Sequence, residues 1–289
     1  MQDSACRACG MEPEDILSSS LETLYDYAPI SHSSPGGLFT YDQHSHDPDL
    51  PPLTVTVSVP DTQTKNWSLQ ATTIWVSALY VADHISELDL PEERGTETSS
   101  AASPSQPLRL IELGAAAGLP SILIAKRYPH ISVVASDFPD DDLIRTLRSN
   151  VARNDATQNC TVVPHAWGTD TSTLLPAADV VLAADTLWDP ALHGALLHTM
   201  CAVLKRTPGA RAHVVAGLHT GRYALEAFLR AAEKAELVLV CGASGATERE
   251  IGGEGRREWD VGRVGGSEDE DERERRRWVV WSVLKWADL

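Results

Sequence analysis

Basic side chains are scarce in this 289-residue sequence, which has 24 Lys and Arg against 41 Asp and Glu and a formal net charge of −17. The shortage is greatest at the start, because residues 1–60 contain one basic side chain, Arg7, and nine Asp or Glu. Nucleic-acid binding needs a basic patch that neutralises phosphates, so nucleic acid is not expected as a partner. An acidic face can attract a basic protein, although it is more often an ordinary solvated surface.

Long apolar runs are also missing. No stretch approaches the ~20 apolar residues that cross a bilayer, so no membrane partner is expected. The first six residues have neither the basic region nor the apolar region of a secretory signal. The cysteines are few and odd in number, at positions 6, 9, 160, 201 and 241, and free thiols are typical of a reducing compartment. A cytoplasmic location is therefore expected.

A strand, a tight loop, a helix and a second strand follow one another from residue 108. The apolar run Leu108–Leu113 predicts the first strand, and a helix is predicted over Leu119–Tyr128. The second strand is predicted over Ile131–Ser136 and ends at Asp137. This order is typical of a βαβ unit that binds an adenosine-containing cofactor, with the terminal acid beside the ribose hydroxyls. Asp137 is therefore a candidate ribose ligand, and a helix-capping carboxylate is the alternative.

The loop between the first strand and the helix indicates which cofactor is bound. Gly114 and Gly118 lack a Cβ, so they allow a sharp turn and a close backbone approach. A dinucleotide fingerprint needs further glycines where this chain has Ala116 and Leu119, so a pyrophosphate would find the loop crowded. The spacing fits the S-adenosylmethionine loop better, with Glu112 placed to reach the ammonium group of that ligand through water. A packing turn in a flavodoxin-like fold is the alternative.

The rest of the chain continues the alternation of strands and helices. Further strands are predicted over 161–163, 179–184, 213–216, 237–241 and 278–286, and helices after Pro139, after Asp189 and over 223–235. Helices between strands predict a parallel doubly wound sheet. The last two strands are separated by the polar, charged stretch 242–277 without a helical pattern, so we expect them to be antiparallel neighbours. The predicted fold is α/β: a Rossmann-like seven-stranded methyltransferase sheet with helices on both faces and a C-terminal antiparallel hairpin. This topology also favours S-adenosylmethionine.

A small N-terminal extension precedes this core. Residues 1–35 are acidic and Ser-rich, which predicts disorder, and residues 36–289 are expected to form a single domain. Within it we distinguish N-terminal strands and a helix (36–90), a linker loop (91–107) and the core (108–289). Gly37–Tyr41 is predicted to pair with Thr54–Val59, and Trp67–Ile85 has the spacing of an amphipathic helix.

Several segments together resemble the fungal nicotinamide N-methyltransferase-like proteins of the lysine-methyltransferase-like family. This group includes the elongation factor 1-alpha N-terminal and lysine methyltransferase. The matching segments are Ile74-Trp75, Glu112–Pro120, Ser136–Asp140, Trp167-Gly168, Leu182–Trp188, Gly217–Arg222, Glu258-Trp259 and Arg277-Trp278. The resemblance extends from about Gly37 to the last residue, and the Asp-Phe-Pro-Asp and Ala-Asp-Thr-Leu-Trp segments are specific in combination.

The resemblance implies a set of cofactor contacts. These come from Trp75, Gly114, Ala115, Ala116, Asp137, Trp167 and Ala184. The small residues at 114–116 admit the methionine moiety, and Phe138 and Trp167 are placed to flank the adenine. Trp75 is expected to close the pocket over the sulfonium, because an aromatic face favours a cation. Ordinary packing in the core or at its rim is the alternative for both tryptophans.

Three residues are catalytic candidates. Asp185 and Trp188 follow a buried strand, and substrates bind at the carboxyl ends of strands in open α/β sheets. Asp185 is placed to orient an attacking amine, with a structural strand-end carboxylate as the alternative. Related protein methyltransferases carry Tyr or Phe at the position of Trp188, so the shape of the substrate slot differs here. His219 ends the next strand and faces the same cleft or serves a structural role.

No metal site is predicted. Asp42, His44, His46 and Asp47 lie close together, but a polar loop before Pro48 explains them better than metal binding. The pair of cysteines at positions 6 and 9 has no second pair, which a zinc site would need.

Three hypotheses of function follow. The first is S-adenosylmethionine-dependent N-methylation of a protein amine, a lysine or an N-terminal amine, with elongation factor 1-alpha as a candidate. The second is methylation of a small amine of the nicotinamide type. The third is a catalytically idle cofactor-binding fold that acts as an interaction module. A nicotinamide dinucleotide reductase is disfavoured by Leu119 and by the closing hairpin.

Overall fold

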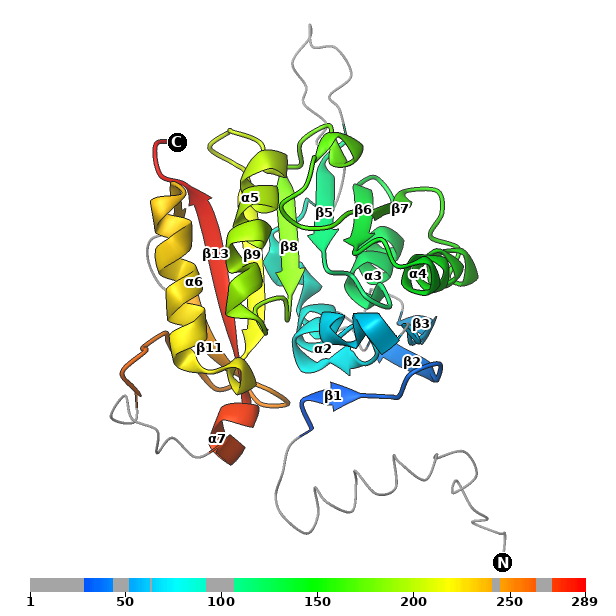
Figure 1. Ribbon diagram of the computed structural model, residues 1–289, viewed down its shortest axis with the longest axis horizontal. Helices are drawn as coiled ribbons and strands as arrows, with labels where there is room; N and C mark the ends of the chain where they lie inside the picture. Colours follow the sequence, from blue (N-terminus) through cyan, green and yellow to red (C-terminus); the bar gives the residue numbers. More distant parts are fainter. Residues whose placement is uncertain (1–28, 44–51, 63, 92–106, 241–244, 264–271) are drawn as a thin grey trace, which may run out of the picture.

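The computed structural model describes residues 29–43, 52–62, 64–91, 107–240, 245–263 and 272–289 (Figure 1). Most of the predicted disordered segment and of the predicted linker lies outside these residues. The same is true of the cysteines at positions 6 and 9 and of His44, His46 and Asp47. Ser31–His32, which belong to the segment predicted to be disordered, form the short strand β1.

A nine-stranded mixed sheet runs through the middle of the molecule, with helices on both faces (Figure 1). Its parallel strands are β5 (Arg109–Leu113), β6 (Ser132–Asp137), β7 (Cys160–Pro164), β8 (Val180–Ala184) and β9 (Arg211–Gly217). Antiparallel strands continue it as β13 (Trp278–Trp286), β10 (Leu237–Leu239), β11 (Ala246–Glu250) and β12 (Arg256–Glu258). The seven predicted strands are all present, and β10 pairs antiparallel with β13 as predicted.

The stretch 242–277, which in the sequence showed no helical pattern, is more than a loop between the last two predicted strands. It contains β11, β12 and the short helix α7 (Glu272–Arg276). The charged residues of β11 do not look like a buried strand in the sequence. Glu248 is nevertheless fully buried, and its carboxylate accepts from Nη1 and Nη2 of Arg222 at 2.6 and 3.0 Å. Arg257 donates to the same carboxylate at 2.7 Å. Paired charges therefore take the place of the apolar alternation that would have marked this strand.

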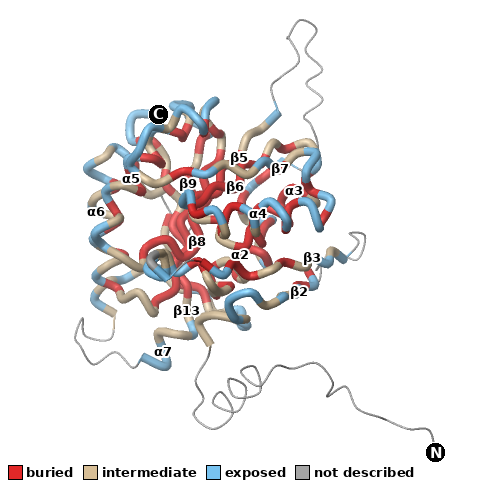
Figure 2. Tube along the Cα trace, turned by 45° about the vertical axis from the view of Figure 1, so that its right-hand side comes forward, coloured by how far each residue is buried: buried red, intermediate tan, exposed pale blue. Residues whose placement is uncertain are grey.

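The sheet divides the buried core into two hydrophobic clusters, and the buried residues gather along its strands (Figure 2). One cluster includes residues of α2 (Val76–Asp83), α3 (Leu119–Arg127) and α4 (Asp141–Arg153), and the other includes residues of α5 (His193–Val203) and α6 (Arg222–Lys234). Short 3-10 turns are η1 (Thr64–Leu69), η2 (Ile85–Leu88), η3 (Ser172–Leu174), η4 (Pro190–Leu192) and η5 (Leu218–Thr220). Across the described part of the chain, no helix combines the length and the apolar character that a membrane span requires.

The predicted helix over Trp67–Ile85 is wrong in its extent. The segment begins as η1, reverses at Gln70 with a φ of +56°, and forms the short strand β4 (Ile74–Trp75) beside β1. Helix α2 begins only at Val76. In the first turn of this helix the backbone N–H of Ser77 has no acceptor within the helix and donates to the Asp185 carboxylate at 3.2 Å. Asp185 therefore caps the helix from a distant part of the chain.

The N-terminal hairpin is attached to the core by two asparagines. Strand β2 (Leu38–Gln43) pairs with β3 (Leu53–Ser58), which confirms the predicted pairing. On α4, the side-chain amide of Asn150 bonds the N–H and C=O of Ser58 at 2.7 and 2.8 Å. Asn154 bonds Thr56 in the same way, at 3.0 and 2.9 Å. These bonds satisfy backbone groups of β3 that no neighbouring strand reaches.

Candidate active site

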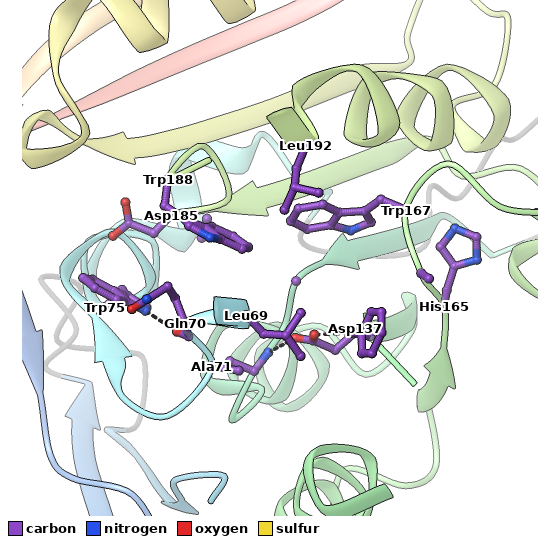
Figure 3. A pocket seen from close by; sticks show the side chains of 15 residues that line it. Leu69, Gln70, Ala71, Trp75, Asp137, His165, Trp167, Asp185, Trp188 and Leu192 are labelled. Carbon is purple, nitrogen blue, oxygen red and sulfur yellow. Dashed lines mark hydrogen bonds between the residues drawn. The ribbon is translucent and has the colours of Figure 1, made fainter. Parts of the chain in front are cut away.

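A cavity of about 160 Å³ lies at the carboxyl ends of β5, β6, β7 and β8 (Figure 3). Nine of the predicted site residues line it: Trp75, Gly114, Ala116, Asp137, Phe138, Trp167, Ala184, Asp185 and Trp188. A smaller cavity of about 30 Å³ adjoins it and is lined by Glu112, Ala115 and several of the same residues. The fold therefore brings all predicted site residues but His219 to the walls of two adjoining cavities.

The loop after β5 is shaped by backbone that only small residues adopt readily. Gly114 has a φ of +78°, and a Cβ there would lie 3.0 Å from Thr186 Cγ2 and 3.2 Å from Trp167 Cζ2. Ala116 has a φ of +47°, in the left-handed region that disfavours side chains. The loop is anchored to the end of β6, because the N–H groups of Gly114 and Ala115 both donate to the Ser136 carbonyl. A larger side chain at 114 would intrude into the cavity.

Asp137 closes this loop from the end of β6. Its carboxylate accepts from the N–H of Ala116 at 2.6 Å and from the N–H of Phe138 at 2.7 Å. Burial raises the pKa of Asp137 to about 6, although these two hydrogen bonds lower it. The N-cap of α4 is Asp140, which accepts from Asp142 and Leu143. The alternative that Asp137 merely caps this helix is therefore wrong.

Glu112 lies at the base of the loop and is turned toward α3. Its carboxylate accepts from the N–H of Ser121 at 3.1 Å and from the Ser121 hydroxyl. Burial raises the pKa of Glu112 to about 8, against the hydrogen bonds from Ser121 that lower it. The contact expected between Glu112 and the ammonium group of the cofactor, through water, stays a prediction.

Two tryptophans hold a segment that sequence reasoning missed. We define the strap as residues Asn66–Ala71. The indole of Trp75 donates to the Gln70 carbonyl at 2.6 Å, and the indole of Trp188 donates to the Ser68 carbonyl at 3.2 Å. Leu69, Gln70 and Ala71 line the cavity beside these rings (Figure 3). The strap was not recognised because all of its residues but Asn66 fell within the predicted helix.

Three further lining residues were also missed. They are His165, Ala166 and Leu192. His165 and Ala166 directly follow β7, so the rule that ligands bind at the carboxyl ends of parallel strands would have found them. His165 is buried, its Nε2 lies 3.2 Å from the Thr199 hydroxyl, and burial lowers the pKa of its imidazole.

Asp185 lines the cavity and also holds two elements of the fold together. One carboxylate oxygen accepts from the Gly217 N–H at 2.9 Å, and the other accepts from the Ser77 N–H at 3.2 Å. These two bonds join the end of β9 and the start of α2 beneath the cavity. Asp185 itself has a φ of +52°, a strained conformation for a residue with a side chain.

His219 lies behind the cavity wall and does not line either cavity. Its ring stacks on Trp75, with centroids 5.4 Å apart and planes at 14°, and its Nε2 is 3.9 Å from Asp185 Oδ1. Gly217 makes room for it, because a Cβ there would lie 2.3 Å from His219 Nδ1. This geometry supports a packing role for His219 rather than direct contact with a substrate.

The cavities favour a cation. Among the residues that the structure describes, neither cavity is lined by a Lys or Arg, whereas Asp137 and Asp185 contribute carboxylates to the larger one. The rings of Trp75, Trp167 and Trp188 face the same space, with the last two 5.5 Å apart. Aromatic faces and carboxylates both attract positive charge when water is excluded.

Comparisons with known proteins agree with this geometry. A family model described as lysine methyltransferase matches residues 61–235, well over half of the chain. The chain belongs to this lysine methyltransferase family. It is thus a methyltransferase, and the matched range contains every predicted site residue from Trp75 to His219.

Two relatives with similar sequences are fungal proteins. The chain is 29% identical over 223 residues to a Neurospora crassa protein N-terminal and lysine N-methyltransferase, covering 68% of this chain and 74% of that one. The corresponding protein of Gibberella zeae is 30% identical over 46% of this chain, which spans about half (52%) of that relative. Among solved structures, the chain is similar to precorrin-6y C5,15-methyltransferase from Geobacter metallireducens, with a TM-score of 0.44 and 16% identity over 78% of this chain and 93% of that one.

Proposed function

We propose that this methyltransferase uses S-adenosylmethionine to methylate a primary amine of a protein, either a lysine side chain or an N-terminal amine. The observation that carries the proposal is the main cavity, where three indoles and two carboxylates meet at the carboxyl ends of parallel strands, with no Lys or Arg of the described residues among the lining side chains. The relatives in Neurospora crassa and Gibberella zeae, which are named protein N-terminal and lysine N-methyltransferases, support the same class of substrate.

The residues of the two cavities fit this cofactor. Gly114 leaves open the space that a Cβ would fill beside Thr186 and Trp167. Asp137 keeps lone pairs on both oxygens for ribose hydroxyls, and the rings of Phe138 and Trp167 border the same cavity. When bound, S-adenosylmethionine supplies a methyl group on a positively charged sulfur. No Lys or Arg of the described residues lines the cavities, so none of them repels that charge.

The residues of this chain then have to position a neutral nitrogen. A lysine has an ordinary pKa of about 10.4 and an α-amine one of about 8, so both lose a proton before they attack. Each oxygen of Asp185 accepts one backbone N–H and keeps a lone pair for an N–H of the amine. Trp75 and Trp188 limit the space around that nitrogen and exclude water. Positioning of this kind is the main contribution that such a displacement needs.

A labelling experiment tests the proposal. The purified chain is incubated with methyl-labelled S-adenosylmethionine and either a fungal lysate or purified elongation factor 1-alpha, our candidate substrate. Proteins are then separated from small molecules, and labelled proteins are digested to locate the methyl group. Label on a lysine or N-terminal amine is expected. Label only in a small amine would favour the nicotinamide type of reaction, and no label in either fraction would favour the idle interaction module.

We also propose a cytoplasmic location. The described cysteines, Cys160 and Cys201, are free thiols, as a reducing compartment favours. Fluorescence microscopy of a tagged chain would test this, and signal confined to a secretory compartment would contradict it.

A further inference from the structure

Trp67 is exposed beside the mouth of the candidate active site. The side chain lies on the strap and is 60% exposed, in contrast to the tryptophans of the core, Trp281 and Trp286. Tryptophan carries a large apolar area, and exposed tryptophans are enriched in the central contacts of protein interfaces. Leu69 and Ala71, two and four residues further along the strap, line the cavity, so the segment that carries Trp67 is also part of the cavity wall.

The strap holds Trp67 in a fixed place. Asn66 donates to the carboxylate of Asp140 at 2.5 Å, which attaches the strap to the start of α4. The carbonyls of Ser68 and Gln70 accept from the indoles of Trp188 and Trp75. Three hydrogen bonds therefore fix the segment on both sides of Trp67. A preorganised anchor costs little ordering free energy when a partner docks.

The surroundings of the strap favour a positively charged partner. Asp141, which is exposed, follows Asp140, the partner of Asn66. Asp189, which is half-exposed, follows Trp188, the partner of Ser68. The described side chains of the strap itself, Asn66–Ala71, carry no charge, and one basic residue, Lys65, directly precedes them in the sequence. The chain as a whole has a net charge of −17. Rim charges of this sign steer basic segments toward the site.

We propose that the strap is the docking site for the amine-bearing segment of the substrate, and that Trp67 is its specificity-determining anchor. The occupant is an extended, lysine-containing segment, whose neighbouring side chain packs on the Trp67 indole while the target amine enters the cavity. This inference rests on the proposed function, because it assumes a protein substrate. It adds a residue outside both cavities that discriminates protein substrates from small amines.

The test compares Trp67→Ala with Tyr223→Ala. Tyr223 is a matched control because it is also an exposed aromatic residue (65%), lies at the same edge of the sheet at the start of α6, and is not on the strap. Steady-state methylation of purified elongation factor 1-alpha gives KM and kcat, and calorimetry gives the Kd for S-adenosylmethionine. We expect Trp67→Ala to raise KM about tenfold with kcat, cofactor Kd and Tm unchanged. Trp67→Phe should raise KM less, and Tyr223→Ala should leave it unchanged.

Other outcomes overturn the inference in distinguishable ways. An unchanged KM in Trp67→Ala rejects the anchor while the proposed function stands. An equal rise in both alanine variants rejects the assignment to the strap. A wild-type dimer that becomes monomeric in Trp67→Ala, measured by sedimentation, assigns Trp67 to a second copy of the chain instead. Wild-type enzyme that labels small amines and no protein rejects both the inference and the proposed function.

Discussion

At the scale of single residues, Asp137 combines two tasks in one carboxylate. It holds the loop at Ala116 and borders the cavity. We predict that Asp137→Ala weakens S-adenosylmethionine binding by about 1.5–3 kcal/mol, the value of hydrogen bonds to a charged group. Calorimetric titration measures the change. Asp141→Ala is the control, because that aspartate is exposed on α4. An unchanged Kd with a lowered Tm would leave Asp137 with a purely structural role.

Asp185 also has two tasks, and a substitution there should affect both. Asp185→Asn places an amide NH₂ near one of two backbone N–H donors, Ser77 or Gly217, so one donor loses its acceptor. We expect a stability loss of about 1–3 kcal/mol and, from the loss of one positioning interaction, a roughly hundredfold lower kcat with cofactor affinity retained. Thermal unfolding and steady-state rates measure the two effects.

The control for this variant is Asp170→Asn. The Asp170 side chain accepts from the Ser172 N–H and does not line the cavities. Normal turnover in Asp185→Asn at a temperature where it stays folded would remove Asp185 from the reaction.

At the scale of elements, a buried acid joins β5 to α3. Glu112 is 1% exposed, and burial raises its pKa from an ordinary 4.5 to about 8. Because the pKa is higher in the fold than in the unfolded chain, the stability from this group is fully present below about pH 4.5. It is lost as the pH rises through 8, by up to about 1.4 kcal/mol per pH unit.

Glu112→Gln should remove this dependence. The amide oxygen can still accept from Ser121, and the side chain at position 112 then has no charge to bury at any pH. We predict that the variant becomes more stable relative to wild type between pH 5 and 8, by an amount on the order of 1 kcal/mol or more. Denaturant unfolding at several pH values measures the difference. Parallel pH profiles for the two proteins would contradict the raised pKa of Glu112.

At the scale of the whole molecule, the site is built from residues of the N-terminal region and of the core that follows it. The strap and Trp75 come from the N-terminal region, whereas Asp137, Trp167 and Asp185 lie at or just after the carboxyl ends of parallel strands. A ligand that binds only this assembled site stabilises the whole fold. At a hundredfold excess over Kd, the gain is about 2.7 kcal/mol, or roughly 5–10 °C in Tm for a domain of this size.

We therefore predict a thermal shift of that size with S-adenosylmethionine or its demethylated product, with micromolar Kd (~8 kcal/mol). The shift should shrink in Asp137→Ala. A shift produced by a nicotinamide dinucleotide in place of these ligands would reject the choice of cofactor.

The seven strands of the core, the helices between them and the positions of Gly114 and Asp137 followed from the sequence by itself. These features depend on local patterns: apolar runs of strand length, turn residues and acids at helix starts act within a few residues. Parallel strands bring their carboxyl ends to one edge, so a local pattern was sufficient to place most site residues on one cavity.

The start of α2, the strap, β11 and the tasks of Glu112 and Asp185 were decided only by the tertiary structure. Ser77 meets Asp185 across 108 residues, and Trp188 meets Ser68 across 120. Similarly, Glu248 is buried in β11 only because Arg222 and Arg257 come from other elements to pair with it. Such bonds override local propensity, since a buried polar group takes its partner from whichever segment the fold brings near.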